Sequence, residues 1–193
     1  MTTTGPTNTT GRPVLSTNGA LIAEPVHEET PRHIAYRYTL AVTRLALGWV
    51  FLWAFLDKTF GLGHETPSAG AWINGGSPTE GFLAHAPKGP FAGFYNDIAG
   101  AAWADWLFMI GLAGIGVALM LGIAMRITAA AGAALLVMMW SAVLPPENNP
   151  FMDDHLIYTL VLVVLALTAA GRTLGFGRVW ERIPFVVRFG FLK

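Results

Sequence analysis

The chain has 193 residues, of which 53% are hydrophobic and only 12% are charged, and its formal net charge is zero. An average soluble domain has roughly 25% charged residues, so this composition indicates a membrane protein. There is no cysteine, which excludes disulfide exchange, iron–sulfur clusters and c-type haem attachment, and no basic cluster suggests binding to nucleic acid.

The first 38 residues are rich in Thr, Gly and Pro. A segment of this composition cannot bury a hydrophobic core, so the sequence predicts a mostly disordered tail over residues 1–38. The charged n-region and the short apolar h-region of a signal peptide are both missing. The first apolar segment is therefore expected to be an uncleaved membrane anchor.

Long apolar segments dominate the rest of the chain, and they predict membrane spans at 39–61, 103–124, 127–144 and 155–172. At about 1.5 Å rise per residue, each segment covers most of a hydrocarbon core of roughly 30 Å. The sequence therefore predicts an all-α membrane protein, a four-transmembrane-helix up-down bundle over residues 39–175.

The second and third predicted spans are separated only by Met125 and Arg126, so they are expected to form an antiparallel hairpin. In the second span, Gly114, Ala118 and Gly122 recur at every fourth residue. Small residues at this spacing let helix backbones approach closely in lipid. The pattern predicts a packing face.

The connections carry their own signals. Residues 62–102 are too many for a simple turn and are expected to form a structured extracytoplasmic loop, in which Ser77 and Glu80 have the spacing of a helix start. Residues 176–193 alternate bulky apolar side chains with arginines, so this segment is expected to lie on the membrane surface beside anionic lipid. Most Lys and Arg fall on the side of the two termini, which predicts that both termini are cytoplasmic.

Arg44 is a charged residue inside the first predicted span. It lies about five residues, or roughly 8 Å, from the start of the span, within reach of the headgroups. Two interpretations of Arg44 are equally supported. It is either an anchor that snorkels to the headgroups, or a donor that faces the bundle and binds an anion or a quinone carbonyl.

Further charges lie at the outer ends of the first and fourth spans. Asp57 and Lys58 end the first span, and Asp153, Asp154 and His155 precede or begin the fourth. Carboxylates at a helix N-terminus accept from its free N–H groups, but capping needs only one of the two. In an antiparallel bundle the outer ends of the first and fourth spans lie at the same depth in the membrane. Lys58 is therefore expected to be the counter-ion of Asp154 or Asp57, with His155 beside them.

Cofactor chemistry is constrained by the same residues. A metal site of Asp57, Asp154 and His155 is conceivable, but sequence-adjacent residues at a helix start rarely ligate one ion, so no metal is expected. No histidine lies well inside a span, which argues against an intrinsic haem. Flat indole rings in the outer half would suit a quinone, although such tryptophans are more often belt or core residues. The candidates are Trp53, Trp72, Trp106 and Trp140.

Several strings together resemble the DoxX/DoxD family of small four-helix membrane proteins: RLALGWVFLWAFLDKTFG, AWINGGSPTEGFL, LPPENNPFMDDHLIYTLVLVVLAL and AGRTLGFGRVWER. The resemblance covers about residues 38–182 and implies a protein of the bacterial cytoplasmic membrane. DoxD-like members of the family are the small membrane subunit of thiosulfate:quinone oxidoreductase, which passes electrons from thiosulfate to a quinone. The polar positions that match the family pattern are Arg44, Asp57, Lys58, Asp154 and His155.

Two hypotheses about function follow. In the first, the chain is a redox subunit in which Lys58 holds a quinone oxygen or a sulfur oxyanion, while Asp57, Asp154 and His155 exchange protons. Histidine suits this role because its ordinary pKa is about 6.5. In the second, the chain is a non-catalytic anchor or assembly subunit of a larger respiratory complex. A solute transporter is disfavoured because no span contains a mid-helix proline. Membrane lipid and other respiratory subunits are the expected partners, and the oligomeric state, including a homo-oligomer, stays open.

Overall fold

The computed structural model describes residues 13–15, 21–23 and 30–193, and the chain divides into two compact units, Met1–Tyr36 and Arg37–Lys193. In the first unit, β1 (Pro13–Leu15) and β2 (Leu21–Ala23) pair in antiparallel fashion, with Val14 opposite Ile22. The remainder of the predicted disordered tail up to residue 29 lies outside the described residues.

The first long helix, α1 (Pro31–Phe60), begins well before the predicted start of the first span at residue 39. The prediction of disorder was therefore wrong for residues 31–38. Proline fits the first position of a helix because its fixed φ is helical and its missing N–H is not needed there. The carbonyl of Thr30 accepts from the N–H of Ile34 at 3.2 Å, which closes the first turn.

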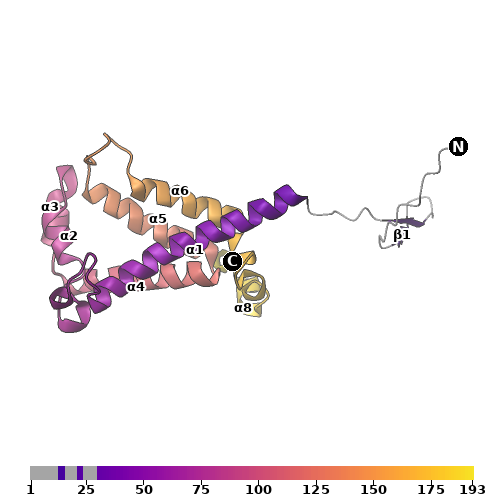
Figure 1. Cartoon of the computed structure of the whole chain (residues 1–193), viewed down its shortest axis with the longest axis horizontal. Coiled ribbons are helices and arrows are strands. Elements are labelled where there is room, and N and C mark those ends of the chain that lie inside the picture. The colour runs from indigo at the N-terminus through magenta and orange to yellow at the C-terminus, as the bar shows by residue number, and fades with distance from the viewer. Residues whose placement is uncertain (1–12, 16–20, 24–29) are drawn as a thin grey trace. The chain divides into compact units, whose positions relative to one another are not determined.

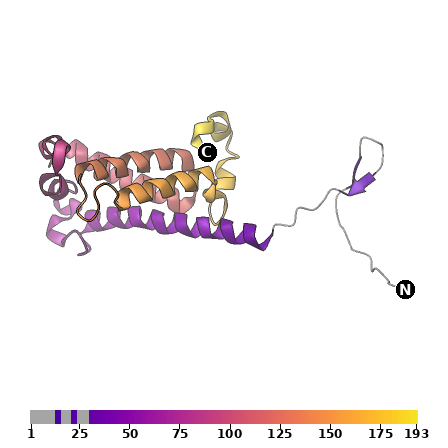
Figure 2. The ribbon, with the colours of Figure 1, turned by 90° about the horizontal axis from the view of Figure 1, so that it is seen from above.

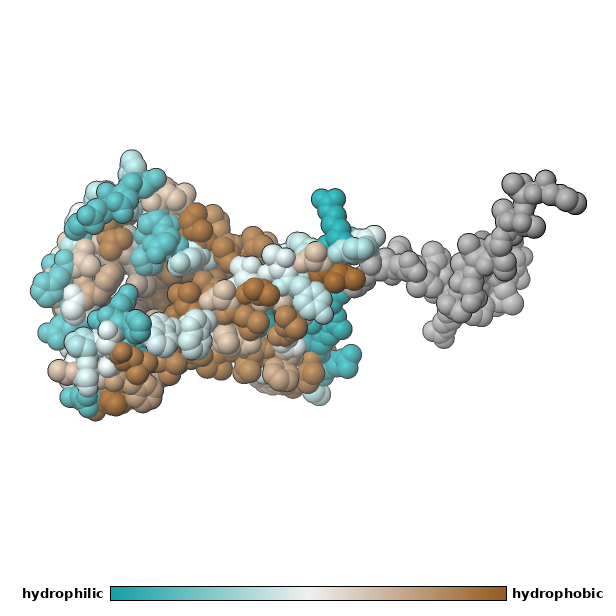
Figure 3. Space-filling model, in the orientation of Figure 1, coloured by the Kyte–Doolittle hydropathy of each residue, from teal (hydrophilic) through white to brown (hydrophobic). Residues whose placement is uncertain are grey.

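Three further long helices complete the bundle in the described part of the second unit: α4 (Ala102–Leu121), α5 (Met125–Ala142) and α6 (Asp154–Leu167). Figures 1 and 2 show that α1, α4, α5 and α6 run alternately up and down, and α5 packs between α4 and α6. Within the described residues, α1, α4 and α5 are long and apolar enough to cross a membrane. Figure 3 shows apolar side chains along the middle of the visible face and hydrophilic ones towards both ends of the bundle.

The helix α6 is shorter than the predicted span 155–172. It has 14 residues and ends at Leu167, after which Ala169 adopts a left-handed conformation with φ of 49°. A non-glycine residue in this conformation cannot continue a right-handed helix. A short 3₁₀ turn, η4 (Ala170–Arg172), occupies the rest of the predicted span.

Two glycines let α1 and α4 approach closely. A Cβ atom at Gly116 would lie 2.8 Å from the backbone nitrogen of Leu52, and one at Gly48 would lie 2.9 Å from the Cβ of Leu119. By contrast, a Cβ at Gly114 would meet nothing within 4 Å. The close contact predicted at Gly114 was therefore wrong, because α4 turns its Gly116 side towards α1.

The hydrophobic core fills the space between the four helices. Its largest side chains come from all of them and are at most 5% exposed: Leu47, Phe51, Met109, Leu112, Ile115, Leu119, Leu136, Leu162 and Leu165. Between membrane helices such side chains stabilise the bundle by van der Waals packing, because lipid is as apolar as the core.

One end of the bundle carries the α1–α4 connection and the 143–153 connection (Figure 1). The first of these forms η1 (Ser68–Gly70), η2 (Trp72–Asn74), α2 (Glu80–His85), η3 (Gly89–Phe91) and α3 (Ala92–Asp97). The Ser77 hydroxyl accepts from the N–H of Glu80 at 3.1 Å, but α2 begins only at Glu80, so the predicted helix start at Ser77 was wrong by about one turn. The Tyr95 hydroxyl donates to the carbonyl of Met138 at 3.0 Å and so ties α3 to α5.

The opposite end carries the C-terminal segment, as Figures 1 and 2 show. It forms α7 (Gly177–Trp180), α8 (Pro184–Arg188) and η5 (Gly190–Leu192). Many of its apolar side chains are more than half exposed, among them Phe176, Val179, Phe185, Val187 and Phe191. The bundle thus has two chemically distinct ends.

Candidate functional site

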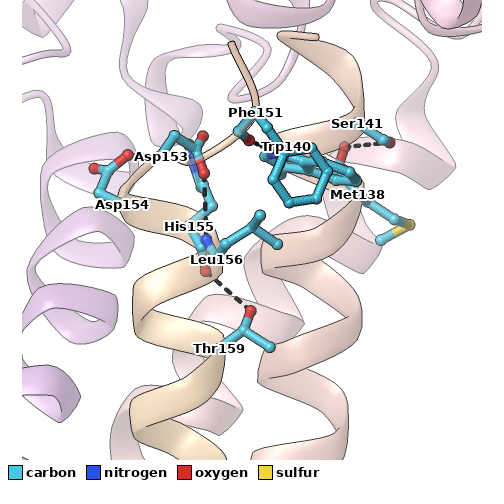
Figure 4. Close-up of polar contacts among 9 residues, drawn as sticks. All are labelled: Met138, Trp140, Ser141, Phe151, Asp153, Asp154, His155, Leu156 and Thr159. Carbon is cyan, nitrogen blue, oxygen red and sulfur yellow. Dashed lines mark hydrogen bonds and ion pairs between the residues drawn. The ribbon is translucent and has the colours of Figure 1, made fainter. Parts of the chain in front are cut away.

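The start of α6 brings an aspartate and a histidine together. Asp153 has an extended backbone and caps α6, because its Oδ1 accepts from the N–H of Leu156 at 3.2 Å. Its other oxygen, Oδ2, lies 2.7 Å from Nδ1 of His155. Figure 4 shows this pair on the first turn of the helix, and Oδ1 of the more exposed Asp154 lies 3.5 Å from the same ring nitrogen. Asp153 therefore both caps the N-terminus of α6 and orients the imidazole of His155.

The Asp153 contact determines which nitrogen of His155 can react. When Nδ1 carries the proton that it donates to Asp153, Nε2 of the neutral ring is an acceptor. Nε2 has no hydrogen-bond partner among the described residues, and it is not sealed from solvent. The pair is thus arranged for proton exchange at Nε2.

A cleft of about 590 Å³ opens beside this pair. It lies between the end of α2, the 143–153 connection and the start of α6, and its charged or titratable lining residues are His85, Lys88, Glu147, Asp153, Asp154 and His155. Apolar parts of the lining come from Val143, Pro146 and Met152. The volume falls in the range of roughly 300–1,000 Å³ that is usual for small-molecule sites. We call this space the outer cleft.

Two contacts hold the walls of the outer cleft. The N–H of Lys88 donates to the carbonyl of Ala142 at 2.9 Å, which fixes the α2–η3 segment against the end of α5. The indole Nε1 of Trp140 donates to the carbonyl of Phe151 at 2.8 Å, and the two rings meet edge to face with centroids 5.2 Å apart. Figure 4 shows Trp140 and Phe151 next to the Asp153–His155 pair.

Asp153, Asp154 and His155 at the start of α6 have donor atoms of the kind that bind metal ions. One oxygen of Asp153, one of Asp154 and a ring nitrogen of His155 all lie within 4.8 Å of one another. Carboxylate and imidazole donors suit Mn, Fe or Zn. The metal site considered from sequence combined Asp57 with Asp154 and His155. In the structure Asp153, and not Asp57, lies beside those two residues.

Asp57 anchors the loop that follows α1. Its side chain is 2% exposed, and it accepts from the backbone N–H groups of His64, Glu65 and Thr66 at 3.3, 3.1 and 2.9 Å. Hydrogen bonds from three N–H groups to one carboxylate are charge-assisted, so they hold the loop firmly at the end of α1. The lone pairs that proton transfer would need are therefore used to hold the loop.

Lys58 pairs with a different residue from the one expected. Its Nζ lies 3.7 Å from the Glu65 carboxylate. No ion pair joins Lys58 to Asp57 or to Asp154 within the part of the chain that the structure describes, so the predicted pairing was wrong. The reason is local, since the turn at residues 61–66 returns Glu65 to the end of α1. The polar residues of the two helix ends thus form separate groups.

Asp105 is a buried carboxylate that the sequence analysis did not select. It is 7% exposed, and its Oδ1 accepts from the Ser77 hydroxyl, the Thr79 hydroxyl and the Thr79 N–H at 2.9, 2.7 and 3.0 Å. These contacts attach the start of α2 to the start of α4. The motif SPT shortly before a helix, together with an acidic residue in the first turn of the next span, was the available signal.

Arg44 faces the interior of the bundle, which contradicts the snorkelling anchor, and the partners of its Nη groups are backbone carbonyls of the chain. It is fully buried, and its guanidinium donates to the carbonyls of Leu119 and Met120 at the end of α4 and to those of Thr173 and Leu174. Helix ends leave carbonyls without partners, and a guanidinium can supply several donors at once. Both Nη groups of Arg44 are thus hydrogen-bonded to backbone carbonyls of the chain.

The four selected tryptophans lie in three separate aromatic groups, and Trp53 also meets Trp49 with ring centroids 5.7 Å apart. Trp53 meets His64 with ring centroids 5.1 Å apart, Trp72 meets Trp106 at 4.6 Å, and Trp140 meets Phe151 at 5.2 Å. Of the four, Trp140 is the one that adjoins the outer cleft through its bond to Phe151.

Comparison of the chain with protein-family models, with curated proteins and with solved structures found no significant match. The resemblance to the DoxX/DoxD family therefore stays a prediction from sequence, and the geometry of the outer cleft is the basis for a functional proposal.

Proposed function

We propose that the chain is the membrane subunit of a quinone-linked redox complex of the DoxX/DoxD type, and that the outer cleft is its ligand site. The observation that carries this proposal is the Asp153–His155 pair, with Nδ1 and Oδ2 2.7 Å apart, at the wall of a cleft of about 590 Å³. Small-molecule sites are commonly clefts of this size in which a few polar groups converge on an otherwise apolar lining.

The placement in the membrane is part of the proposal. In it, α6 is a fourth span, completed by flanking residues and by local thinning of the bilayer, since a helix of 14 residues covers about 21 Å. Both termini are cytoplasmic because most Lys and Arg lie on that side. The outer cleft then opens at the boundary between lipid and the extracytoplasmic water, where a lipid-soluble molecule can enter.

The residues of the outer cleft fit a quinone headgroup. Val143 and Met152 offer apolar surface to a ring, while Lys88 offers donors to its carbonyl oxygens and His155 does so from Nε2 when that nitrogen also carries a proton. A bound quinone would supply an acceptor of two electrons and two protons. Lys88 holds and polarises one oxygen, taking the role first assigned to Lys58. His155 delivers a proton from one ring nitrogen, Asp153 keeps the ring in place, and Asp154 connects the pair to water.

The electrons come from a partner subunit in this proposal. The chain has no cysteine, and histidines suited to hold a haem between the helices are not found among the described residues of the spans. A sulfur oxyanion such as thiosulfate is the donor that the family resemblance implies. The complex therefore needs at least one further redox protein on the same side of the membrane.

A second candidate function is a non-catalytic anchor or assembly subunit. The observation that favours it is the structural use of three polar residues: Arg44 caps α4, Asp57 fastens the loop after α1, and Asp105 attaches α2 to α4. In this alternative the outer cleft is a docking surface for a partner loop.

Replacement of one histidine separates the two candidates. The complex is purified in mild detergent with wild-type chain, with His155→Gln, and with His64→Gln, which makes the same change on the same side of the bundle outside the outer cleft. Loss of a general acid is expected to lower quinone reduction about 100-fold in the assembled His155→Gln complex, with His64→Gln unchanged. Full turnover of an assembled His155→Gln complex would contradict the redox role and leave the anchor.

A further inference from the structure

A second cleft lies where α6 ends and the chain leads on to α7. Figures 1 and 2 show this part of the chain at the end of the bundle opposite the α1–α4 connection. The cleft has a volume of about 260 Å³ and is formed by α1, the end of α6 and the segment that leads to α7. Its side chains include three arginines and two threonines: Arg37, Arg172, Arg178, Thr168 and Thr173. We call this space the arginine cleft.

The guanidinium groups of the arginine cleft are held in different ways. Nε of Arg37 donates to the Thr173 hydroxyl at 3.3 Å. Arg172 forms an ion pair with Glu181, in which Nη2 and Oε2 are 2.7 Å apart. Hydrogen bonds from Arg172 to Glu181 raise the pKa of the arginine above its ordinary value, so its charge persists. The residues that line the arginine cleft in the described part of the chain include three arginines and no acidic side chain, so the lining itself is basic.

Arg178 has donors to spare. It is exposed, it lines the arginine cleft, and none of the contacts between described residues involves its guanidinium. Arginine recognises phosphate through two parallel N–H bonds. A tetrahedral anion is thus the ligand class that fits the unpaired charge.

The surroundings of the arginine cleft are those of a lipid contact. Leu40 of α1 lines it, Leu167 at the end of α6 is 81% exposed, and Phe176 and Val179 on either side of Arg178 are 62% and 63% exposed. In water this exposure would be unfavourable, whereas acyl chains solvate such side chains at the membrane interface. Basic pockets between the ends of membrane helices are suited to acidic headgroups.

We propose that the arginine cleft binds the phosphate of an anionic phospholipid headgroup, with Arg178 as its main donor and with Arg172 and Arg37 completing the positive lining. The acyl chains lie along the exposed face of α6. This site is independent of the outer cleft, so it holds whether the chain is a redox subunit or an anchor.

The test uses the full-length chain in a zwitterionic detergent. Native mass spectrometry counts bound lipid after addition of phosphatidylglycerol or phosphatidylcholine, for wild-type chain and for the variants Arg178→Gln and Arg182→Gln. Arg182 is the matched control, since it is also exposed in the C-terminal segment but does not line the arginine cleft. The loss of a charge-assisted contact is expected to lower phosphatidylglycerol retention about tenfold for Arg178→Gln, and to leave it unchanged for Arg182→Gln.

Two further measurements on the wild-type chain keep the test decisive. Increasing salt is expected to release phosphatidylglycerol, because exposed charges are screened within about 10 Å at 0.1 M ionic strength. Inorganic phosphate at millimolar concentration is expected to leave the lipid bound. Equal retention of the two lipids, equal loss in both variants, retention that is independent of salt, or displacement by inorganic phosphate would each overturn the lipid site, the last in favour of a free anion.

Discussion

The guanidinium of Arg44 lies against the turn that follows α6, where its Nη2 donates to the carbonyl of Leu174 at 2.7 Å. The other Nη group reaches the carbonyl of Met120 at 3.1 Å, so one side chain joins the end of α4 to the C-terminal segment. Gly122 makes room for it, since a Cβ atom there would lie 2.9 Å from Nη1 of Arg44.

Arg44→Met is expected to destabilise the fold without altering the chemistry. It leaves buried carbonyls without donors, at a cost of about 3 kcal/mol. Arg44→Lys recovers only part of this, because an ammonium cannot reach several carbonyls with the geometry of a guanidinium. The measurement is the thermal unfolding midpoint in detergent. Arg182→Met is the exposed control, and a midpoint of Arg44→Met equal to that of the control would contradict the role of a clamp.

Gly116→Ala and Gly114→Ala are expected to have opposite effects. At Gly116 the added methyl group collides with the backbone of Leu52 and separates α1 from α4, with a loss of about 1–3 kcal/mol. At Gly114 it meets nothing, and replacement of glycine in a helix gains up to about 1 kcal/mol. Thermal unfolding of the two variants in one detergent checks this. Equal midpoints would show that the α1–α4 contact is looser than described.

Asp57→Asn is expected to loosen the loop after α1 rather than to change a proton pathway. The asparagine amide keeps one acceptor but loses the charge that strengthens the bonds from His64, Glu65 and Thr66. Hydrogen exchange at these three amides should rise about tenfold or more. Asp97→Asn is the control, since Asp97 is exposed. Unchanged exchange in Asp57→Asn would mean that the loop is held elsewhere.

Apolar segments could be located from sequence because each helix buries or presents hydrophobic side chains along nearly its whole length. Their ends were less predictable. Residues 31–38 include Arg32, His33 and Arg37 and thus read as a polar tail, yet they continue α1. The end of α6 depends on the left-handed backbone of Ala169, and an alanine carries no signal for that conformation.

The candidate site was predictable in part. His155 and Asp154 stood out as charges at a helix start, but the hydrogen-bond partner of His155 is Asp153, which was not among the candidate site residues. The ion-pair partner of Lys58 was predicted from its depth in the bundle, whereas the short turn after α1 places Glu65 beside it. The outer cleft joins residues 85–88 with residues 143–155, and only tertiary packing through the Lys88 N–H and the end of α5 brings these segments together.

The central claim is that a quinone headgroup binds in the outer cleft beside His155. Photolabelling tests it most directly: a quinone with a photoreactive group on its ring is added to the purified complex, and the modified peptides are identified by mass spectrometry. The account predicts adducts within residues 85–88 and 143–155 that excess unmodified quinone prevents. Adducts confined to other segments, or labelling of the outer cleft that excess quinone does not reduce, would contradict it.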